Sequence, residues 1–272
     1  GAGGMGGAGG MGGAGGVGGA GGMGGVGGMG GAGGEGGAGG EGGFGGEGGF
    51  GGAPPPAPVE LSWDLTQRMH LFWTHGFADY PAADEDRFFF EAGMANLPDA
   101  VQMARETGYE LSARNRNEDL FAYVTHVVTR EAGLQPDVDY RVTYEVTLLT
   151  QGGTGCDEGR FNLVKLGASG AEPTAVADDA GVVRLNLDKG EGPQGGADLS
   201  LAGDLQNGNE DCANPDWRYK TIRHAHPTAV RPVGDVNAEA LWLTVGVESM
   251  VAGDLRLFVT RVDATLTPVD AP

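Results

Sequence analysis

Oxygen-bearing side chains are concentrated in one stretch of the sequence, NLDKGEGPQGGADLSLAGDLQNGNEDC, residues 186–212. Carboxylate and amide oxygens are the hard ligands that Ca²⁺ prefers, and this ion takes about six to eight of them. The candidate ligands are Asp188, Asp198, Asp204, Asn207, Asn209 and Asp211. Their spacing matches neither an EF-hand nor a nonapeptide calcium repeat. Asp, Asn and Gly also dominate tight turns, so polar turns are the favoured interpretation and a calcium site is the alternative. No other cofactor is predicted.

Cys156 and Cys212, the only cysteines of the chain, flank the same stretch. They do not form a C-x-x-C pair, which argues against a zinc knuckle. In an exported protein they would form a disulfide that closes a loop of about 56 residues and stabilises the fold by about 3–4 kcal/mol. Two buried free thiols are the alternative in a reducing compartment. We predict the disulfide.

Catalytic motifs are sparse. His224 and His226 alternate in RHAHP and could face a metal together, but no third ligand is evident and surface histidines are the favoured interpretation. No G-x-S-x-G nucleophile elbow occurs, and no pair of carboxylates stands out among the 37 acidic residues. We therefore predict that the protein is not an enzyme. The tryptophans, Trp63, Trp73, Trp217 and Trp242, could include a platform for sugar stacking, with Trp242 assigned to the core.

A glycine-rich repeat occupies residues 1–52, and every triplet up to residue 51 has the form G-X-G. A period of three fits neither the α-helix nor the β-strand, but it matches the polyproline II geometry, which glycine adopts as polyglycine II. All X side chains would then lie along one edge of a rod roughly 160 Å long, and the glycine edges would be free to pair with other rods. The predicted assembly stripe includes Ala2, Met5, Ala8, Met11, Val17, Met23, Val26, Met29, Phe44 and Phe50.

This tail has two simpler interpretations. Collagen shares the period but depends on imino acids, and the chain has no proline before Pro54. Glycine-rich segments are often flexible spacers, but a spacer needs no register, and the first eleven X residues are all Ala, Met or Val. Ordering one tail alone would cost about 1–2 kcal/mol per residue, so only a bundle of several copies could become ordered. We predict that the chain associates with copies of itself through this tail.

The remaining chain has the composition of a globular domain. The segment APPPAP, residues 53–58, resists helix and sheet and marks a hinge before a domain at 59–272. Alternating runs such as YRVTYEVTLLT (140–150) and EALWLTVGVES (239–249) predict strands, and DLFAYVTHVVT (119–129) is assigned to a strand rather than a helix. Gly, Asn, Asp and Pro separate these runs. The pattern predicts an all-β fold, an antiparallel two-sheet sandwich or jelly roll.

The charge and hydropathy of the chain exclude several partners. The net charge is −20, which is unfavourable for binding the phosphates of nucleic acid or an anionic membrane surface. No apolar run is long enough to span a membrane. The repeat starts in phase at Gly1 without an initiator Met, so we expect an extracellular or cell-surface protein whose signal peptide has been removed.

Seven motifs in order resemble a family of uncharacterised secreted bacterial proteins, many of them lipoproteins, over residues 63–268. The motifs are WTHGFADYP, YELSARNRNEDLFAYVTHVV, GLQPDVDYRVTYEV, NLVKLGAS, LNLDKG-x-x-x-QGG, GD-x-QNG and LWLTVG. The resemblance implies a secreted β-sandwich similar to carbohydrate-binding-module jelly rolls, with no assigned activity.

Two functions follow as hypotheses. The first is a structural subunit of an extracellular filament or surface fibre, in which bundled tails form a shaft and the sandwich decorates or links it. The alternative is a cell-surface module that binds an extracellular glycan and is carried on a flexible glycine stalk.

Overall fold

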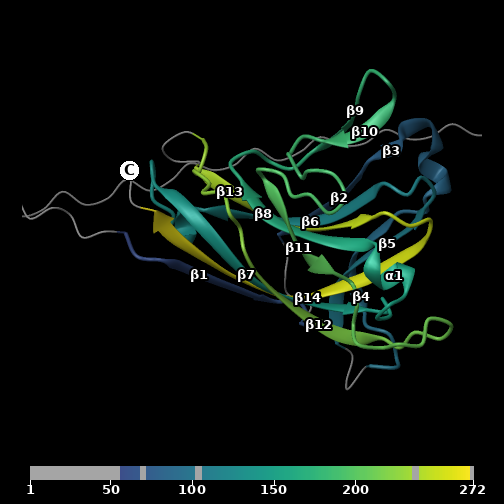
Figure 1. Ribbon diagram of the computed structural model, residues 1–272. Coiled ribbons are helices and arrows are strands. Elements are labelled where there is room, and N and C mark those ends of the chain that lie inside the picture. Colours follow the sequence, from purple (N-terminus) through teal and green to yellow (C-terminus); the bar gives the residue numbers. More distant parts are fainter. Residues whose placement is uncertain (1–55, 68–71, 102–105, 235–238, 270–272) are drawn as a thin grey trace, which may run out of the picture. The chain divides into compact units, whose positions relative to one another are not determined.

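Antiparallel strands form the framework of the part of the protein that the computed structural model describes, residues 56–67, 72–101, 106–234 and 239–269 (Figure 1). The predicted all-β class and the sandwich of antiparallel sheets are confirmed. The predicted strand at 119–129 is also confirmed, since Leu120–Thr129 forms a strand. The tail at 1–52 and its assembly stripe lie outside the described residues, so the predictions made for them stay predictions.

The described strands occur in the following chain order: β1 (Val59–Asp64), β2 (Trp73–Ala78), β3 (Tyr80–Pro81), β4 (Glu91–Asn96), β5 (Thr107–Asn115), β6 (Leu120–Thr129), β7 (Asp139–Thr150), β8 (Asn162–Ser169), β9 (Ala175–Ala177), β10 (Val182–Leu185), β11 (Leu199–Asp204), β12 (Arg218–Ala225), β13 (Ala240–Ser249) and β14 (Gly253–Val269). Helical turns in the described part of the chain are short: Ala82–Arg87, Arg130–Ala132 and α1 (Asp157–Arg160).

The first sheet is built around β14, which has 17 residues. The strand order is β12-β7-β14-β5-β4, and β1 also pairs with β14. The first part of β14, Gly253–Val259, pairs with β5, and the part from Arg261 to Leu266 pairs with β1. A register shift between Val259 and Arg261 separates the two parts. Such a bulge adds a residue and twists the strand, and β14 pairs with two different strands, β5 and β1, on the same edge before and after it.

The second sheet has the order β11-β8-β13-β6-β2 and packs its inner face against the first sheet. Alternation sets the two faces, because successive side chains of a strand point to opposite sides. Val164 and Leu166 of β8 and Val245 of β13 are therefore in the main core. Lys165, between Val164 and Leu166, points to the outer face.

The small third sheet, β3-β10-β9, lies against the outer face of the second sheet. Its Ala175 and Leu185 pack on Phe121 and Tyr123 of β6. A methyl group at Gly246 would overlap the ring of Phe121, so glycine is required where this ring crosses β13. This part of the second sheet is therefore covered on both faces, and Phe121, Tyr123 and Lys165 of its outer face lie in the protein interior.

The structure shows where three of the four tryptophans lie relative to the main core. Trp73 is in the main core, and Trp63 packs edge-on against it with ring centroids 5.6 Å apart. Trp242 alternates with the core residues Leu241 and Leu243 and is only half-buried, so its assignment to the core is wrong. The reason is register: Trp242 occupies an outer-face position of β13.

Candidate functional site

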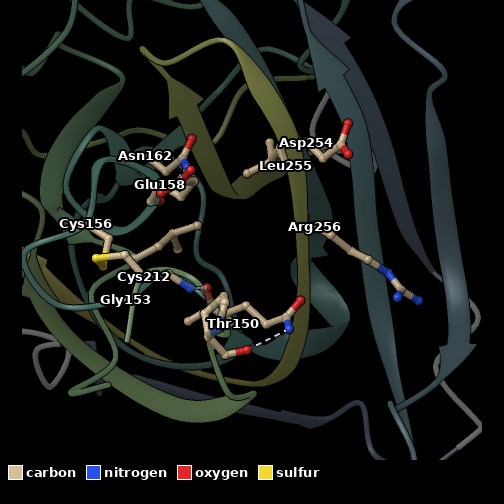
Figure 2. Close-up of a pocket in the computed structure, with 13 residues that line it drawn as sticks. Thr150, Gly153, Cys156, Glu158, Asn162, Cys212, Asp254, Leu255 and Arg256 are labelled. Carbon is tan, nitrogen blue, oxygen red and sulfur yellow. Dashed lines mark hydrogen bonds between the residues drawn. A yellow bond between two sulfur atoms is a disulfide. The ribbon is translucent and has the colours of Figure 1, made fainter. Parts of the chain in front are cut away.

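A cavity of about 350 Å³ opens at the end of the sandwich where β7 ends and β14 begins (Figure 2). Thr150 contributes the last position of β7, and Asp254, Leu255 and Arg256 contribute the start of β14. The loop that follows β7, residues 151–156, and α1 complete the wall. A volume of this size lies at the lower end of the range for small-ligand sites, which is about 300–1,000 Å³.

The disulfide between Cys156 and Cys212 forms one side of this cavity and confirms the predicted pairing. It joins the loop after β7 to the polar stretch 186–212, across 56 residues of sequence. Asn207 reinforces the junction, because its Nδ2 donates to the carbonyl oxygen of Thr150 at 2.7 Å. The sequence prediction thus located one wall of the site without locating the cavity.

Polar side chains also line the cavity. The side chain of Asn162 is buried, and its Nδ2 donates to the Glu158 carbonyl oxygen at 2.5 Å. Among the described residues, Asn162 Oδ1 has no hydrogen-bond partner. Gln151 Nε2 donates to the Pro215 carbonyl oxygen at 2.8 Å. A cavity with a few fixed polar groups and an apolar floor can orient a polar ligand.

An aromatic strip adjoins the cavity and consists of Trp217, Tyr219, Arg256 and Phe258. Arg256 lines the cavity, but its side chain points away from it (Figure 2). Its guanidinium lies 5.6 Å from the Trp217 ring centroid and 5.3 Å from that of Phe258. The Trp217 and Phe258 rings meet edge to face at 5.5 Å, and Arg256 Nε is 2.6 Å from Glu110 Oε1. These contacts hold the Arg256 guanidinium against the Trp217 and Phe258 rings.

Tyr219 is the exposed aromatic ring of this strip, whereas the Phe258 ring is fully buried. Tyr219 lies two residues beyond Trp217, on the outer face of the first sheet, with 46% of its surface exposed. Partial burial, followed by the charge of Glu106, raises the pKa of Tyr219. The phenol is therefore neutral near neutral pH.

The predicted calcium ligands make other polar contacts in the structure. Asp188 accepts backbone N–H groups from Gly190 and Ala197, and Asp204 Oδ1 is 2.6 Å from Lys220 Nζ. The other candidates also accept backbone N–H groups close in sequence: Asp198, Asn207, Asn209 and Asp211. Over the described ranges, no group of three or more His, Cys, Asp or Glu side chains is arranged to hold a metal ion. Turn chemistry accounts for these oxygens.

Of the two histidines of RHAHP, His226 is buried and His224 is half-buried, whereas surface residues were the favoured interpretation. Ser200 Oγ lies 2.6 Å from His224 Nε2 and 2.9 Å from His226 Nδ1, and His226 is 1% exposed. Ser200 belongs to β11 and His224 to β12, so this group joins an edge strand of each large sheet. Sequence spacing did not reveal the serine, because it approaches from a different sheet.

These histidines predict a loss of stability in mild acid. Burial lowers the pKa of both His224 and His226, so the folded state binds protons more weakly than the unfolded chain, in which a histidine has a pKa of about 6.5. Their contribution is complete above that value and is lost as the pH falls. We expect Tm, followed by circular dichroism, to decrease between about pH 6.5 and 5. The His224→Gln/His226→Gln variant should show a flatter profile; an equal slope in both proteins would contradict this assignment.

A buried network of charges lies on the outer face of the second sheet. Lys165 and Glu248 are fully buried, with Nζ 2.7 Å from Oε2. Lys189 Nζ is 2.6 Å from Glu248 Oε1 and 3.0 Å from Asp79 Oδ2, and Arg184 Nη1 is 2.9 Å from Asp79 Oδ1. Burial disfavours the charged form of Lys189, but Glu248 and Asp79 outweigh it and raise its pKa. The sequence prediction missed this network, although a lysine inside the apolar run NLVKLGAS is a signal for it.

Comparison with known proteins gives structural matches of low TM-score. No protein-family model matches the chain, and no curated protein is similar enough to count as a relative. One similar solved structure is a carbohydrate-binding module of the β-sandwich superfamily (10% identity, TM-score 0.33, 71% of this chain and 56% of that one). Another is the mannan-recognising module TmCBM27 (13% identity, TM-score 0.35, 76% and 97%). A third is the enzymatically active domain of bacteriophage CBA120 tailspike protein 4 (10% identity, TM-score 0.32, 76% and 20%).

Two of these three matches are carbohydrate-binding modules, and the chain spans 56% of the first matched chain and 20% of the tailspike domain. Identities and TM-scores at this level do not transfer a ligand or an activity. The family resemblance noted over residues 63–268 has no matching family model. Within the described residues, no helix is long and apolar enough to cross a membrane.

Proposed function

We propose that the sandwich is an extracellular glycan-binding module whose ligand lies along the aromatic strip and enters the adjoining cavity. One observation carries this proposal: Arg256 belongs to both the cavity and the aromatic strip. It lines the cavity, and its guanidinium lies against the Trp217 ring. The disulfide between Cys156 and Cys212 supports an oxidising location outside the cytosol.

The chemistry of the strip suits a sugar. The C–H face of a pyranose is apolar and packs on an aromatic ring, and its hydroxyl groups pair with fixed polar side chains. Tyr219 offers the exposed ring. Gln151, Glu158 and Asn162 offer amide and carboxylate groups inside the cavity. Arg256 is held by Glu110, so its remaining N–H groups can donate with little loss of side-chain entropy.

The test is affinity electrophoresis and glycan-array binding of the whole chain, followed by calorimetry with any glycan that binds. Tyr219→Ala should weaken binding about tenfold, since an aromatic contact of about 1.4 kcal/mol corresponds to that factor. Phe72→Ala is the matched control, because Phe72 is 71% exposed and does not belong to the strip. Equal binding by wild type and Tyr219→Ala would contradict the proposed surface, and no binding to any array glycan would contradict the function.

We also propose a second function, carried by the G-X-G repeat at residues 1–52. Tails of several copies would bundle as polyglycine II rods and assemble the chain into a filament or fibre. This proposal is compatible with the first, since each copy would still carry its own sandwich.

Negative-stain electron microscopy of the whole chain beside a chain lacking residues 1–52 tests the assembly. We expect filaments or defined oligomers that disappear on truncation. A version with the same tail composition but scrambled triplets is the control, and it should also fail to assemble. Monomers in both the intact and the truncated protein would mean that the tail is a spacer.

A further inference from the structure

Lys189, Asp79 and Glu248 place an amine and two carboxyl groups in direct contact. Lys189 Nζ lies 3.0 Å from Asp79 Oδ2 and 2.6 Å from Glu248 Oε1. The side chains of Lys189, Asp79 and Glu248 are 10%, 4% and 0% exposed. An amine held against one carboxyl group, with a second carboxylate positioned to carry a proton, is the set of groups that amide formation needs.

Asp79 is held rigidly in the orientation that this contact requires. Its φ is 63°, a left-handed conformation that residues other than glycine rarely adopt. Its N–H donates to the Val183 carbonyl oxygen at 2.6 Å, and its own carbonyl oxygen accepts from Asn117 Nδ2 at 2.7 Å. Arg184 Nη1 holds Oδ1 at 2.9 Å, which leaves Oδ2 facing Lys189. Backbone strain of this kind persists where the surroundings enforce it, and it is concentrated at functional positions.

We propose that Lys189 and Asp79 become joined by an isopeptide bond. Lys189 Nζ forms a bond to Cγ of Asp79, and the bond from Cγ to Oδ2 breaks. Glu248 accepts a proton from Nζ and passes it to the departing Oδ2, which leaves as water with two protons from the amine. An ammonium and a carboxylate thus give an amide and one water, without a change in net charge or any other reactant. Arg184 donates to Oδ1 while negative charge develops there.

The environment favours the amide over the ion pair. Without the bond, the ammonium groups of Lys165 and Lys189 pair with the carboxylates of Glu248 and Asp79 in the protein interior. Buried charges carry a large desolvation cost, and condensation removes one of each sign. The pair between Lys165 and Glu248 remains intact at 2.7 Å. The released water has an exit, because Asp79 and Lys189 also line a surface hollow of about 280 Å³.

The bond would fasten two segments that are far apart in the sequence. Asp79 lies between β2 and β3, and Lys189 lies in the loop between β10 and β11. The link would therefore lock the third sheet onto the outer face of the second sheet, which suits a protein exposed to proteases outside the cell.

Intact-mass spectrometry of the purified whole chain after reduction tests this inference. We expect a mass about 18 Da below that of the sequence, the mass of one water. Trypsin should release a linked pair of peptides, residues 69–87 and 185–218, since the joined Lys189 is no longer a cleavage site. A mass equal to that of the sequence, or a deficit located elsewhere in the chain, would overturn the proposal.

Two variants sharpen the result. Lys189→Arg keeps the positive charge but should show no mass deficit. Asp79→Asn should lose ammonia, about 17 Da, and reach the same final mass as the linked wild-type chain. A water-sized deficit that persists in Lys189→Arg would contradict the assignment. If either variant fails to fold, the mass of the wild-type chain still shows whether the isopeptide bond forms.

Discussion

Replacing Glu248 by leucine should destabilise the domain by about 3–5 kcal/mol, because it leaves the fully buried ammonium of Lys165 without its carboxylate. Lys165 Nζ would keep only carbonyl oxygens, those of Lys189 at 2.7 Å and Gln194 at 3.1 Å. These dipoles do not balance a full charge in the protein interior. Denaturant unfolding and Tm measure the loss, and for a domain of this size we expect Tm to fall by on the order of 10 °C.

The matched control removes both charges together. In Lys165→Met/Glu248→Leu the interior contains no unpaired ammonium at this position, so much of the stability lost in the single variant should return. The comparison forms a double-mutant cycle and gives the coupling between the two side chains. A double variant as unstable as Glu248→Leu would mean that packing rather than charge determines the cost. The expectation holds whether or not Lys189 is joined to Asp79, since Lys165 pairs with Glu248 in both cases.

Cys156→Ser/Cys212→Ser should be less stable than the wild type by about 3–4 kcal/mol, because the bridge closes 56 residues of sequence and restricts the unfolded chain. Reduction of the wild-type protein should produce a similar loss. The variant should also bind any glycan ligand more weakly, because both cysteines line the cavity at the end of the sandwich.

An exposed polar loop provides the control for the cysteine variant. Asp178→Ala removes a side chain that accepts the N–H groups of Ala180 and Val182 in the turn after β9, away from the cavity. It should lower stability slightly and leave ligand binding unchanged. Unaltered stability in the cysteine variant would show that the unfolded chain is already restricted without the bridge, for example by a second covalent link.

The fold was predictable because alternation is a local property. Val142, Tyr144 and Val146 of β7 are buried at every second position, and the polar residues between them face solvent or an exposed partner. The disulfide was predictable for a similar reason, since only two cysteines were available to pair. The sheet order was not predictable in this way, because β14 lies next to strands from three distant parts of the sequence.

The buried charges show where the sequence pattern was insufficient. Lys165 and Glu248 occupy outer-face positions of β8 and β13, at which a polar residue predicts contact with water. The third sheet and the loop between β10 and β11 cover that face instead, and their position depends on contacts far apart in the chain. The same limit applies to His224 and His226, whose partner Ser200 belongs to the other large sheet.

The sequence alone does not separate a calcium site from turn chemistry in the stretch 186–212, for a chemical reason. Asp and Asn are suited both to cation binding and to local capping of backbone N–H groups, and composition does not distinguish these uses. Asp188 and Asp211 use their carboxylates for nearby backbone groups. A cation would have to compete with those contacts and with the ammonium of Lys220 at Asp204.

The central position of β14 has a consequence for biosynthesis. This strand is the last one described in the chain, yet it pairs with β1, β5 and β7. While the ribosome is still adding these residues, the first sheet has no middle strand, and the earlier strands cannot bury their apolar faces against it. Sheets completed by such distant pairings form slowly. The first sheet can therefore be completed only after β14 has been synthesised, and until then the strands that pair with β14 remain unpaired on that side.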